Sequence, residues 1–392
     1  MKIYNWQKSD WPQFHYESSI LDESLISIAE KTGLIRGKLT HLSKDLQTEA
    51  MIDRMVEEAV KTSEIEGEYI SRPDIRSSIK NKLGLNQDLI KINDKRAKGL
   101  VDLMFDVRNS FEEPLTDTKL FNWHLMLLSS SVNPNLRIAT WRTHEEPMQV
   151  VSGHYGEWMV HFEAPPSRDV PKEMEKFIHW FNDTAPGGPK AIKFAPIRAA
   201  IAHLYFESIH PFEDGNGRIG RAIAEKALSQ GFGYPALLSL SQAIELDKKA
   251  YYSALNAASK TNEITAWLQY FAGLVKIAQS EVELQVNFIL KKSAFFNTFE
   301  NDLNERELKV VKRMMRAGIS GFEGGMSAKK YMVIASTSKP TATRDLQHLV
   351  AINAFKSIGS GRSVRYELNI ERSPSNSINL QKPNEGSSHE FA

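Results

Sequence analysis

Two stretches near the middle of the chain repeat apolar residues at the spacing of an α-helix, and a short polar segment separates them. One side of the first stretch carries Ile197, Ile201, Leu204, Tyr205 and Ser208. One side of the second carries Ile219, Ala222, Ile223 and Ala227. Because residues three or four apart share a face of a helix, the pattern predicts one helix that runs into His210 and another that ends at Gly231.

The polar segment, residues 210–221, reads His-Pro-Phe-Glu-Asp-Gly-Asn-Gly-Arg-Ile-Gly-Arg. A glycine-containing loop before a helix presents free backbone N–H groups and the positive end of the helix dipole to an anion. Arg218 and Arg221 share one face of the first helical turn and add two fixed positive charges. The segment therefore predicts a site for a polyphosphate.

Two side chains of this segment add chemistry to the predicted anion site. Mg²⁺ prefers one or two carboxylates together with phosphate oxygens, so Asp214 is suited to hold it. His210, at the other rim of the loop, has the pKa range needed to take a proton from an attacking hydroxyl. A solvated polar turn would explain any one of these residues, but not all of them at this spacing.

The segment matches every specified position of HPFxxGNGRxxR, the active-site motif of the Fic family, which this chain resembles. Fic proteins mostly transfer AMP from ATP to a Ser, Thr or Tyr hydroxyl of a target protein. The resemblance implies that His210 is the general base and that Asp214 holds Mg²⁺. It also implies that three groups of residues contact the nucleotide. Gly215, Asn216 and Gly217 would contact the α-phosphate, and Arg218 and Arg221 would contact the β- and γ-phosphates. Tyr252 would lie beside the adenine or ribose.

A helix from Glu49 to Glu66 is predicted by an apolar stripe upstream of the motif. The stripe comprises Ile52, Met55, Val56 and Ala59. Its continuation places Glu66 on the buried side and at the negative end of the helix dipole, with Gly67 as the stop. A carboxylate in that position requires a cation. The pattern alone equally allows a rotated or frayed helix with Glu66 in solvent.

Residues 62–67, Thr-Ser-Glu-Ile-Glu-Gly, resemble the (S/T)xxxE(G/N) inhibitory motif of Fic proteins. The resemblance implies that Thr62 and Glu66 are inhibitory and that Glu66 pairs with Arg221. In relatives the same glutamate can position water for removal of AMP, so AMP addition and AMP removal both stay open.

Two β-rich runs, residues 148–151 and 158–162, flank Gly153-His154-Tyr155-Gly156 and predict a hairpin. The resemblance implies that this hairpin is a flap that aligns a target segment by strand pairing. The residues that it assigns to the flap are Val150, Val151, Val160 and His161. A purely structural hairpin is the alternative. His154 and His161 lack a third ligand at a sensible spacing, so no metal site is expected there.

Residues 301–370 read as a small separate domain. Residues 326–331 and 338–349 resemble a helix-turn-helix, and 359–368 resemble a winged hairpin. The segment has 12 lysines and arginines against 6 aspartates and glutamates. This basic balance favours DNA, with Arg344 in the recognition helix and Arg362 at the wing tip. Winged helices also dock proteins, which is the alternative.

Composition adds the class of protein. The chain has 392 residues, of which 41% are hydrophobic, and a net charge of +1. It is large enough for two or three domains, and its neutral charge gives no general attraction to nucleic acid or membrane. The absence of cysteine fits a reducing cytoplasm. No apolar run is as long as a membrane span, and the N-terminus lacks the apolar core of a signal peptide. We expect a soluble cytoplasmic protein.

These observations predict a mainly α protein with an all-helical Fic core and a β-hairpin flap. The expected parts are an N-terminal helical region at 1–95 with its inhibitory helix at about 49–66, the Fic core at 96–273, a linker helix at 274–300, a winged-helix domain at 301–370 and a disordered tail at 371–392. We expect helices at 246–259 and 274–290 within these parts.

The leading functional hypothesis is a protein adenylyltransferase that uses ATP and Mg²⁺ on a target protein hydroxyl and is restrained by Glu66. The alternative is a nucleotide-sensing, DNA-binding transcriptional regulator. Transfer of another phosphate-containing group is disfavoured because the anion loop and both arginines suit ATP. A homodimer stays open.

Overall fold

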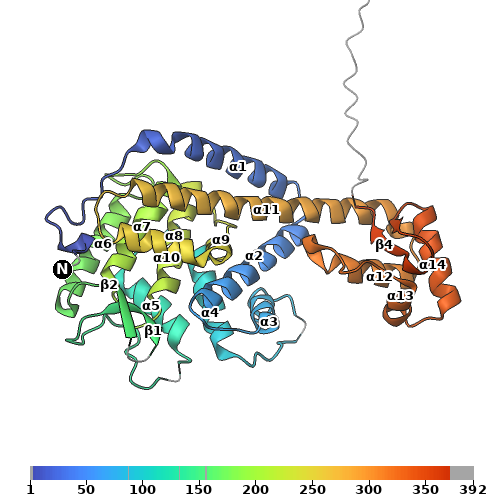
Figure 1. The fold of residues 1–392 in the computed structure, drawn as a ribbon, viewed down its shortest axis with the longest axis horizontal. Coiled ribbons are helices and arrows are strands. Elements are labelled where there is room, and N and C mark those ends of the chain that lie inside the picture. The colour runs from blue at the N-terminus through green and yellow to red at the C-terminus, as the bar shows by residue number, and fades with distance from the viewer. Residues whose placement is uncertain (1–2, 87, 132, 155–156, 371–392) are drawn as a thin grey trace, which may run out of the picture. The chain divides into compact units, whose positions relative to one another are not determined.

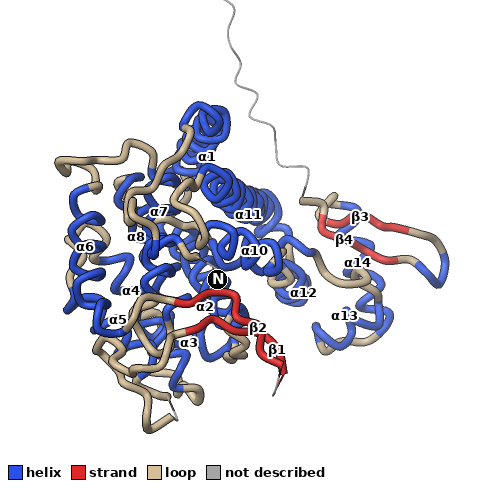
Figure 2. The backbone as a smooth tube through the Cα atoms, turned by 60° about the vertical axis from the view of Figure 1, so that its left-hand side comes forward, coloured by secondary structure: helices blue, strands red, loops and turns tan. Residues whose placement is uncertain are grey.

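The computed structural model describes residues 3–370 apart from 87, 132 and 155–156, and for residues 152–154, 157–159 and 362 it describes the backbone alone. The mainly α fold expected from the sequence is confirmed, and the strands pair as two small antiparallel hairpins (Figure 2). Among the described helices, none combines the length and apolar character needed to cross a bilayer. The expected tail at 371–392 and the hairpin turn at Tyr155 and Gly156 lie outside the described residues.

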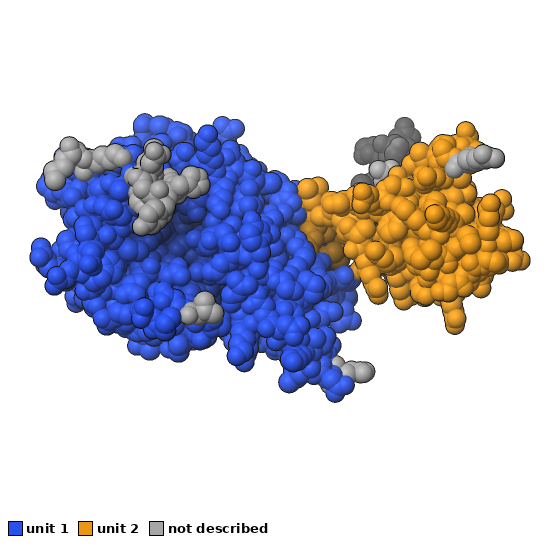
Figure 3. Space-filling model, turned by 60° about the horizontal axis from the view of Figure 1, so that its bottom comes forward, with its two compact units in different colours: residues 1–283 blue, residues 284–392 orange. Residues whose placement is uncertain are grey.

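The chain divides into two compact units, residues 1–283 and 284–392 (Figure 3). The elements of the first unit are the short 3₁₀ helix η1 (Asn5–Gln7), α1 (Asp22–Thr40), α2 (Lys44–Ile65), α3 (Arg72–Lys82), α4 (Lys95–Asn109), α5 (Asp117–Leu128), β1 (Gln149–His154), β2 (Glu157–Glu163), α6 (Val170–Asp183), α7 (Ala195–Ile209), α8 (Asn216–Phe232), α9 (Leu240–Leu246) and α10 (Lys248–Ala258). Figure 1 shows their order along the chain.

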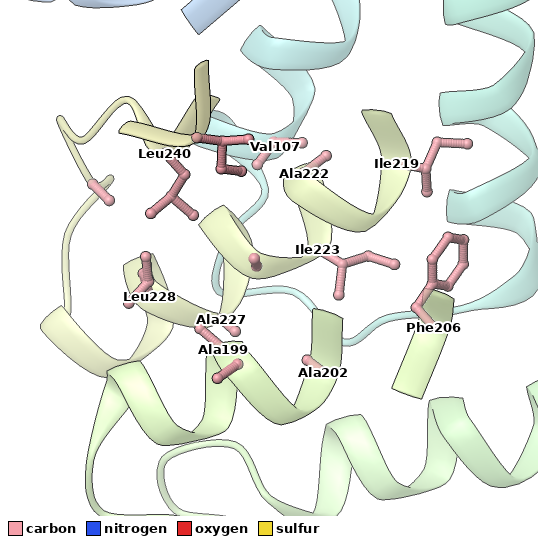
Figure 4. Packing of buried hydrophobic residues seen from close by; sticks show 14 of the residues in the cluster. Val107, Ala199, Ala202, Phe206, Ile219, Ala222, Ile223, Ala227, Leu228 and Leu240 are labelled. Atoms are coloured by element: carbon pink, nitrogen blue, oxygen red, sulfur yellow. The ribbon is translucent and has the colours of Figure 1, made fainter. Parts of the chain in front are cut away.

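Helices α7 and α8 form the centre of the first unit, and every residue of α7 is buried. Figure 4 shows Ala199 and Ala202 of α7 beside Ala227 and Ile223 of α8, where small side chains let the two backbones approach closely. This packing fixes the loop between the two helices, which carries the motif.

The end of α8 differs from the sequence expectation. The helix continues past Gly231 and ends at Gly233, whose left-handed backbone (φ 74°) provides the stop. Gly231 is instead a packing residue, because a Cβ there would lie 2.3 Å from the Cβ of Ala195. The sequence pattern does not distinguish a glycine needed for close packing from one needed for a turn.

The helix α2 begins earlier than the apolar stripe indicates, because Ser43 caps its N-terminus by accepting a hydrogen bond from the backbone N–H of Leu46. Its other end agrees with the expectation, since Glu66 is the C-cap and Gly67 has a left-handed backbone (φ 77°). The helix expected at 246–259 is broken at Asp247, whose side chain caps the N-terminus of α10.

The helix α11 (Thr265–Phe299) is continuous from the end of the expected core through the expected linker helix at 274–300. The boundary between the two units falls within it, after Glu283, which lies inside the segment expected to be a linker helix at 274–300. Its first half contributes buried residues such as Trp267 to the core of the first unit, and its last turns contribute Phe295 and Phe299 to the core of the second.

The second unit contains α12 (Glu305–Met315), α13 (Ala328–Ala335), α14 (Lys339–Ala351), β3 (Phe355–Ile358) and β4 (Arg365–Leu368). A capping box starts α12, because Asn304 and Glu307 each accept a hydrogen bond from the other's backbone. Antiparallel pairing of β3 with β4, from Phe355 opposite Leu368 to Ile358 opposite Arg365, completes the unit.

Candidate active site

His210 caps the C-terminus of α7 with a left-handed backbone (φ 50°, ψ 61°). Residues other than glycine rarely adopt this backbone conformation, so surrounding contacts must hold it. The turn is closed by the His210 backbone N–H, which donates to the carbonyl of Phe206 at 2.9 Å. This turn leads the chain from the end of α7 toward the start of α8.

Arg142 supplies the contacts that hold this turn. Its Nε donates to the carbonyl of His210 at 2.8 Å, and its backbone N–H donates to the carbonyl of Pro211 at 2.9 Å. Its Nη2 also reaches the carbonyls of Ile209 and Pro165. A buried guanidinium therefore satisfies carbonyls left without helical partners at the end of α7. The sequence analysis did not assign this function to Arg142.

The loop is closed from inside by Asn216 and Phe212. The Asn216 side chain accepts a hydrogen bond from the Phe212 N–H and donates one to the Phe212 carbonyl, both at 2.9 Å. Each end of its amide therefore has one partner within the loop, and one amide N–H is left over for a further acceptor. The fully buried Phe212 ring anchors the loop in the core.

His124 is buried against this loop and stacks on Phe212 at 4.0 Å between ring centroids. Its Nδ1 accepts a hydrogen bond from the backbone N–H of Ala139, so Nε2 carries the proton that is donated to the carbonyl of Asp214 at 3.1 Å. Burial lowers the pKa of His124. A neutral histidine thus positions the backbone of Asp214.

The first turn of α8 directs free N–H groups into the site. Gly215 precedes the helix with a left-handed backbone (φ 80°), and the first intrahelical bond runs from the N–H of Ile219 to the carbonyl of Gly215. The N–H groups of residues 216–218 therefore have no partner within the helix. The exposed carboxylate of Asp214 lies at the same end and accepts a hydrogen bond from the Gly215 N–H at 2.6 Å.

Arg221 and Glu66, brought together from elements far apart in the sequence, form an ion pair at this helix end. Arg221 Nη2 lies 2.8 Å from Glu66 Oε1, and Arg221 Nε donates to Thr62 Oγ1 at 2.8 Å. Burial on its own would raise the pKa of Glu66, but the charge and hydrogen bond of Arg221 hold it below its ordinary value. Burial alone would lower the pKa of Arg221, and the Glu66 carboxylate holds it above its ordinary value.

Gly217 shows how closely the Glu66 carboxylate approaches α8. A Cβ at Gly217 would lie 2.5 Å from Glu66 Oε1. The carboxylate therefore rests against the first turn of the helix, which is where the dipole favours an anion.

Arg218 is held by a residue that the sequence analysis missed. Its Nη1 lies 2.8 Å from Glu68 Oε1, and its Nη2 lies 3.6 Å from Asp214 Oδ1. The side chain of Arg218 is buried. The sequence signal that could have identified Glu68 is its position two residues after Glu66 at the end of a helix. That spacing allows the two carboxylates to lie beside the two arginines.

A cavity of about 840 Å³ connects these residues and is of the size that holds small-molecule ligands. Of the predicted site residues, its walls contain Glu66, Val150, Val151, His161, His210, Asp214, Gly215, Asn216, Gly217, Arg221 and Tyr252. Arg218, Thr62 and Val160 lie outside its lining. Arg344 and Arg362 belong to the second unit, and the side chain of Arg362 lies outside the described residues.

The hairpin borders this cavity with a β-bulge. Val150 pairs with Phe162 and Val151 pairs with Val160, so His161 is the additional residue on β2. Such a bulge changes the direction of a side chain beside a site, and His161 here lines the cavity. Ser259 also lines the cavity.

Two buried groups beside the cavity have strongly shifted pKa values. Burial, reinforced by the charge of Arg142, lowers the pKa of His210 to about 4, so its imidazole is neutral near pH 7. Burial raises the pKa of Glu207 to about 8, against the opposing effect of Arg221. His210 Nδ1 lies 3.6 Å from Glu207 Oε2 and makes no hydrogen bond within the described chain. Glu207 was not expected from the sequence.

Comparison with known proteins places two families on this chain. Residues 114–228 match the Fic/DOC family, and residues 4–85 match a domain of unknown function, DUF4172. The protein adenylyltransferase Fic of Nematostella vectensis is 29% identical over 130 residues, which is 33% of this chain and 28% of that protein. Its counterpart in Drosophila grimshawi is 30% identical over 108 residues, 28% of this chain and 20% of that protein. The matched segment thus spans less than a third of either relative.

Comparison with solved structures gives matches over a larger part of the chain. A Fic family protein from Desulfovibrio desulfuricans G20 is 20% identical, with a TM-score of 0.49, and the match covers 88% of this chain and 95% of that one. Fic-1 from C. elegans is 19% identical, with a TM-score of 0.48, and the match covers 68% and 72%. The whole motif at residues 210–221 lies inside the segment that matches by sequence. On the basis of this sequence match, the chain contains a Fic/DOC family domain at residues 114–228.

Proposed function

We propose that this protein transfers AMP from ATP to a Ser, Thr or Tyr hydroxyl of a target protein and that Glu66 restrains the transfer. The observation that carries the proposal is one cavity whose walls contain a neutral histidine, an exposed carboxylate, the N-terminus of a long helix and an arginine. The adenylyltransferase names of the relatives support the same chemistry.

In the proposed reaction, the hydroxyl oxygen of the target attacks the α-phosphorus of ATP. The bond between the α-phosphorus and the bridging oxygen to the β-phosphate breaks, and pyrophosphate leaves. The proton of the hydroxyl passes to the imidazole of His210, which is unprotonated at pH 7 and so able to accept it. The N–H groups at the start of α8 and the charge of Arg221 would stabilise the phosphates.

The residues present fit the Mg²⁺ that accompanies ATP. Asp214 lines the cavity with an exposed carboxylate, and one carboxylate together with phosphate oxygens is a typical Mg²⁺ environment. No cluster of three or more His, Asp or Glu side chains able to hold a metal occurs among the described residues. When bound, Mg²⁺ would neutralise phosphate charge, with Asp214 as its protein ligand.

Restraint follows from where Glu66 lies. Its carboxylate rests against the first turn of α8 and pairs with Arg221, so it occupies the position that a terminal phosphate of ATP would need. A nucleotide whose γ-phosphate cannot reach Arg221 would settle with its α-phosphate out of line for attack. We propose that Thr62 supports this arrangement by holding Arg221 through its hydroxyl and its carbonyl.

The β1–β2 hairpin is the proposed docking element for the target. Val151 and His161 line the cavity on its inner side, and an edge strand can pair with an extended segment through main-chain hydrogen bonds. Such pairing would place a hydroxyl near His210 without demanding a particular target sequence.

Covalent labelling tests the proposed function. The full chain is incubated with α-³²P-ATP, Mg²⁺ and a cell lysate, and labelled peptides are identified by mass spectrometry. AMP on a Ser, Thr or Tyr hydroxyl supports the proposal. A different phosphate-containing adduct, or no adduct from the unrestrained Glu66→Gly variant, refutes it.

The acid limb of the pH profile should reflect the buried state of His210. A base is active when deprotonated, so its lowered pKa moves the loss of activity to lower pH. We expect labelling by Glu66→Gly at saturating Mg²⁺-ATP to retain most of its rate at about pH 5.5 and to fall only below it, and not near the ordinary histidine pKa of about 6.5. Removal of Glu66 takes away a charge that raises the pKa of His210, which reinforces this direction. An acid midpoint at or above about pH 6.5 would contradict this assignment.

DNA binding by the second unit is a second candidate function, and the surface of α14 favours it. Thr343, Arg344 and Gln347 are exposed on this helix. The acidic residues Glu307 and Asp345 are buried, with Asp345 bound by Arg306 and Tyr331. Neither carboxylate is therefore on the exposed face of α14, as expected for a helix that meets phosphates.

Loss of Arg344 and Arg362 should weaken DNA binding without changing AMP transfer. For Arg344→Ala/Arg362→Ala we expect the slope of log affinity against log salt to fall by about two, one for each phosphate contact. Gel-shift titrations of the full chain between low and high salt measure this, with Lys309→Ala/Lys312→Ala on α12 as a charge-matched control. Equal effects of the two double variants, or no salt-dependent binding by the wild type, would show that α14 is not a DNA-reading helix.

A further inference from the structure

The base of the β1–β2 hairpin packs on the N-terminal segment and not on the main core. Tyr4, Phe162 and Ala164 form a buried apolar cluster separate from the large core of the first unit. Trp6, Met148 and Val150 pack against this cluster. Figures 1 and 2 both show the N-terminal segment beside the hairpin.

Direct contacts tie Tyr4 and Trp6 to strand β2. The rings of Tyr4 and Phe162 meet edge to face, with their centroids 5.1 Å apart. The indole Nε1 of Trp6 donates a hydrogen bond to the backbone carbonyl of Glu163 at 2.7 Å. Glu163 is the last residue of β2, so the indole holds the strand where it leaves the sheet.

Asn5, between these two aromatic residues, is fixed to the other side of the cavity. Its backbone N–H donates to the carbonyl of Ser259, and its side-chain amide donates to Ser208 Oγ, both at 2.8 Å. Ser208 and Ser259 line the cavity, and Ser208 lies two residues before His210. Asn5 is completely buried. Three consecutive residues therefore connect the hairpin to the helices that carry the catalytic motif.

We propose that Tyr4, Asn5 and Trp6, the N-terminal strap, position the β1–β2 hairpin over the cavity so that a target segment can pair with it. This inference rests on the proposed docking function of the hairpin. The strap residues act through the hairpin and touch neither reacting group, so they are positioning residues. They lie in the segment that matches the domain of unknown function, and the inference gives that part of the segment a function.

The physical reason is that a two-stranded hairpin is at best marginally stable alone and needs a surface to pack on. Without the strap, Phe162 and Val150 would lose buried contacts at the cavity wall. Strand pairing with a target would then require the hairpin to be ordered at the moment of binding, which weakens binding. ATP binding at α8 does not require the hairpin to become ordered, so it would not be weakened.

Matched tryptophan variants test the strap. Trp6→Phe removes the indole donor to Glu163, whereas Trp11→Phe removes the equivalent donor to Glu173 Oε2 on α6, a bond of 2.8 Å. Both changes are made in the full chain, and hydrogen exchange of peptides covering residues 148–164 is measured by mass spectrometry. We expect Trp6→Phe to speed exchange there by about two- to tenfold, the range for one hydrogen bond, and Trp11→Phe to leave it unchanged.

The second readout uses the Glu66→Gly background, with lysate proteins labelled from α-³²P-ATP as the probe. Trp6→Phe should reduce labelling by about two- to tenfold while the affinity for Mg²⁺-ATP, measured by calorimetry, stays unchanged. Unchanged hairpin exchange, equal exchange in both tryptophan variants, or faster exchange with full labelling would each overturn the inference. If Glu66→Gly itself labels nothing, the proposed function fails, whereas the exchange comparison still decides whether the strap holds the hairpin.

Discussion

Replacing His210 with alanine should slow AMP transfer by about 10²–10⁴-fold, the usual contribution of a general base, and should leave ATP affinity nearly unchanged. The imidazole is neutral and borders the cavity, whereas the phosphates are expected at the start of α8 and at Arg221. The measurement is the initial rate of labelling from α-³²P-ATP in the Glu66→Gly background, together with ATP affinity by calorimetry.

The backbone of His210 requires a second variant. Its left-handed conformation (φ 50°) strains alanine, and asparagine adopts that conformation more readily. His210→Asn therefore removes the base while preserving the turn. If His210→Asn labels protein at the parent rate, His210 is not the base. If His210→Ala alone also loses ATP affinity, the loop has moved, and the asparagine variant gives the relevant rate.

Replacing Glu66 with glycine should raise labelling by at least about tenfold. The charge-assisted bond to Arg221 is the contact that competes with a phosphate, and such bonds contribute about 1.5–3 kcal/mol, or about ten- to a hundredfold in productive binding. Removal of the carboxylate also clears the first turn of α8 beside Gly217. Thr62 still holds Arg221, so the arginine stays in place to meet the γ-phosphate.

Control variants separate this effect from a change in the helix end. Glu64→Gly makes the same substitution in the last turn of α2, where the partner is Lys61 and not an active-site arginine, and should not raise labelling. Arg221→Ala should not mimic Glu66→Gly, because it removes the restraint and the phosphate contact together, and the double variant should resemble Arg221→Ala. Equal labelling by wild type and Glu66→Gly across ATP concentrations would refute the restraint.

The motif loop can be predicted from local patterns, whereas the proximity of Glu66 to Arg221 is implied by the family resemblance. Helical apolar stripes that end at Ser208 and begin at Ile219 predict one helix before the loop and another after it. A carboxylate at the buried side of a helix C-terminus demands a cation, and the resemblance identifies which one. The structure places the two side chains 2.8 Å apart.

Other features of the site leave little trace in the sequence because they depend on distant parts of the chain meeting. Arg142 acts on backbone carbonyls, which carry no residue signature. The side chain of Asn216 is used to close the loop, which the motif alone does not reveal. Trp6 reaches Glu163 across 157 positions in sequence. The stop expected at Gly231 was wrong, since close packing and chain reversal both select glycine.

The most direct test of AMP transfer compares two positions of the label in ATP. The Glu66→Gly variant is incubated with a cell lysate and either α-³²P-ATP or γ-³²P-ATP, and protein-bound label is counted after denaturation. Relative to lysate without the variant, we expect additional label from the α position, no additional label from the γ position, and loss of the additional α label when His210→Asn is added. Additional covalent label from the γ position, or additional α label that persists without His210, would contradict transfer of AMP by this site.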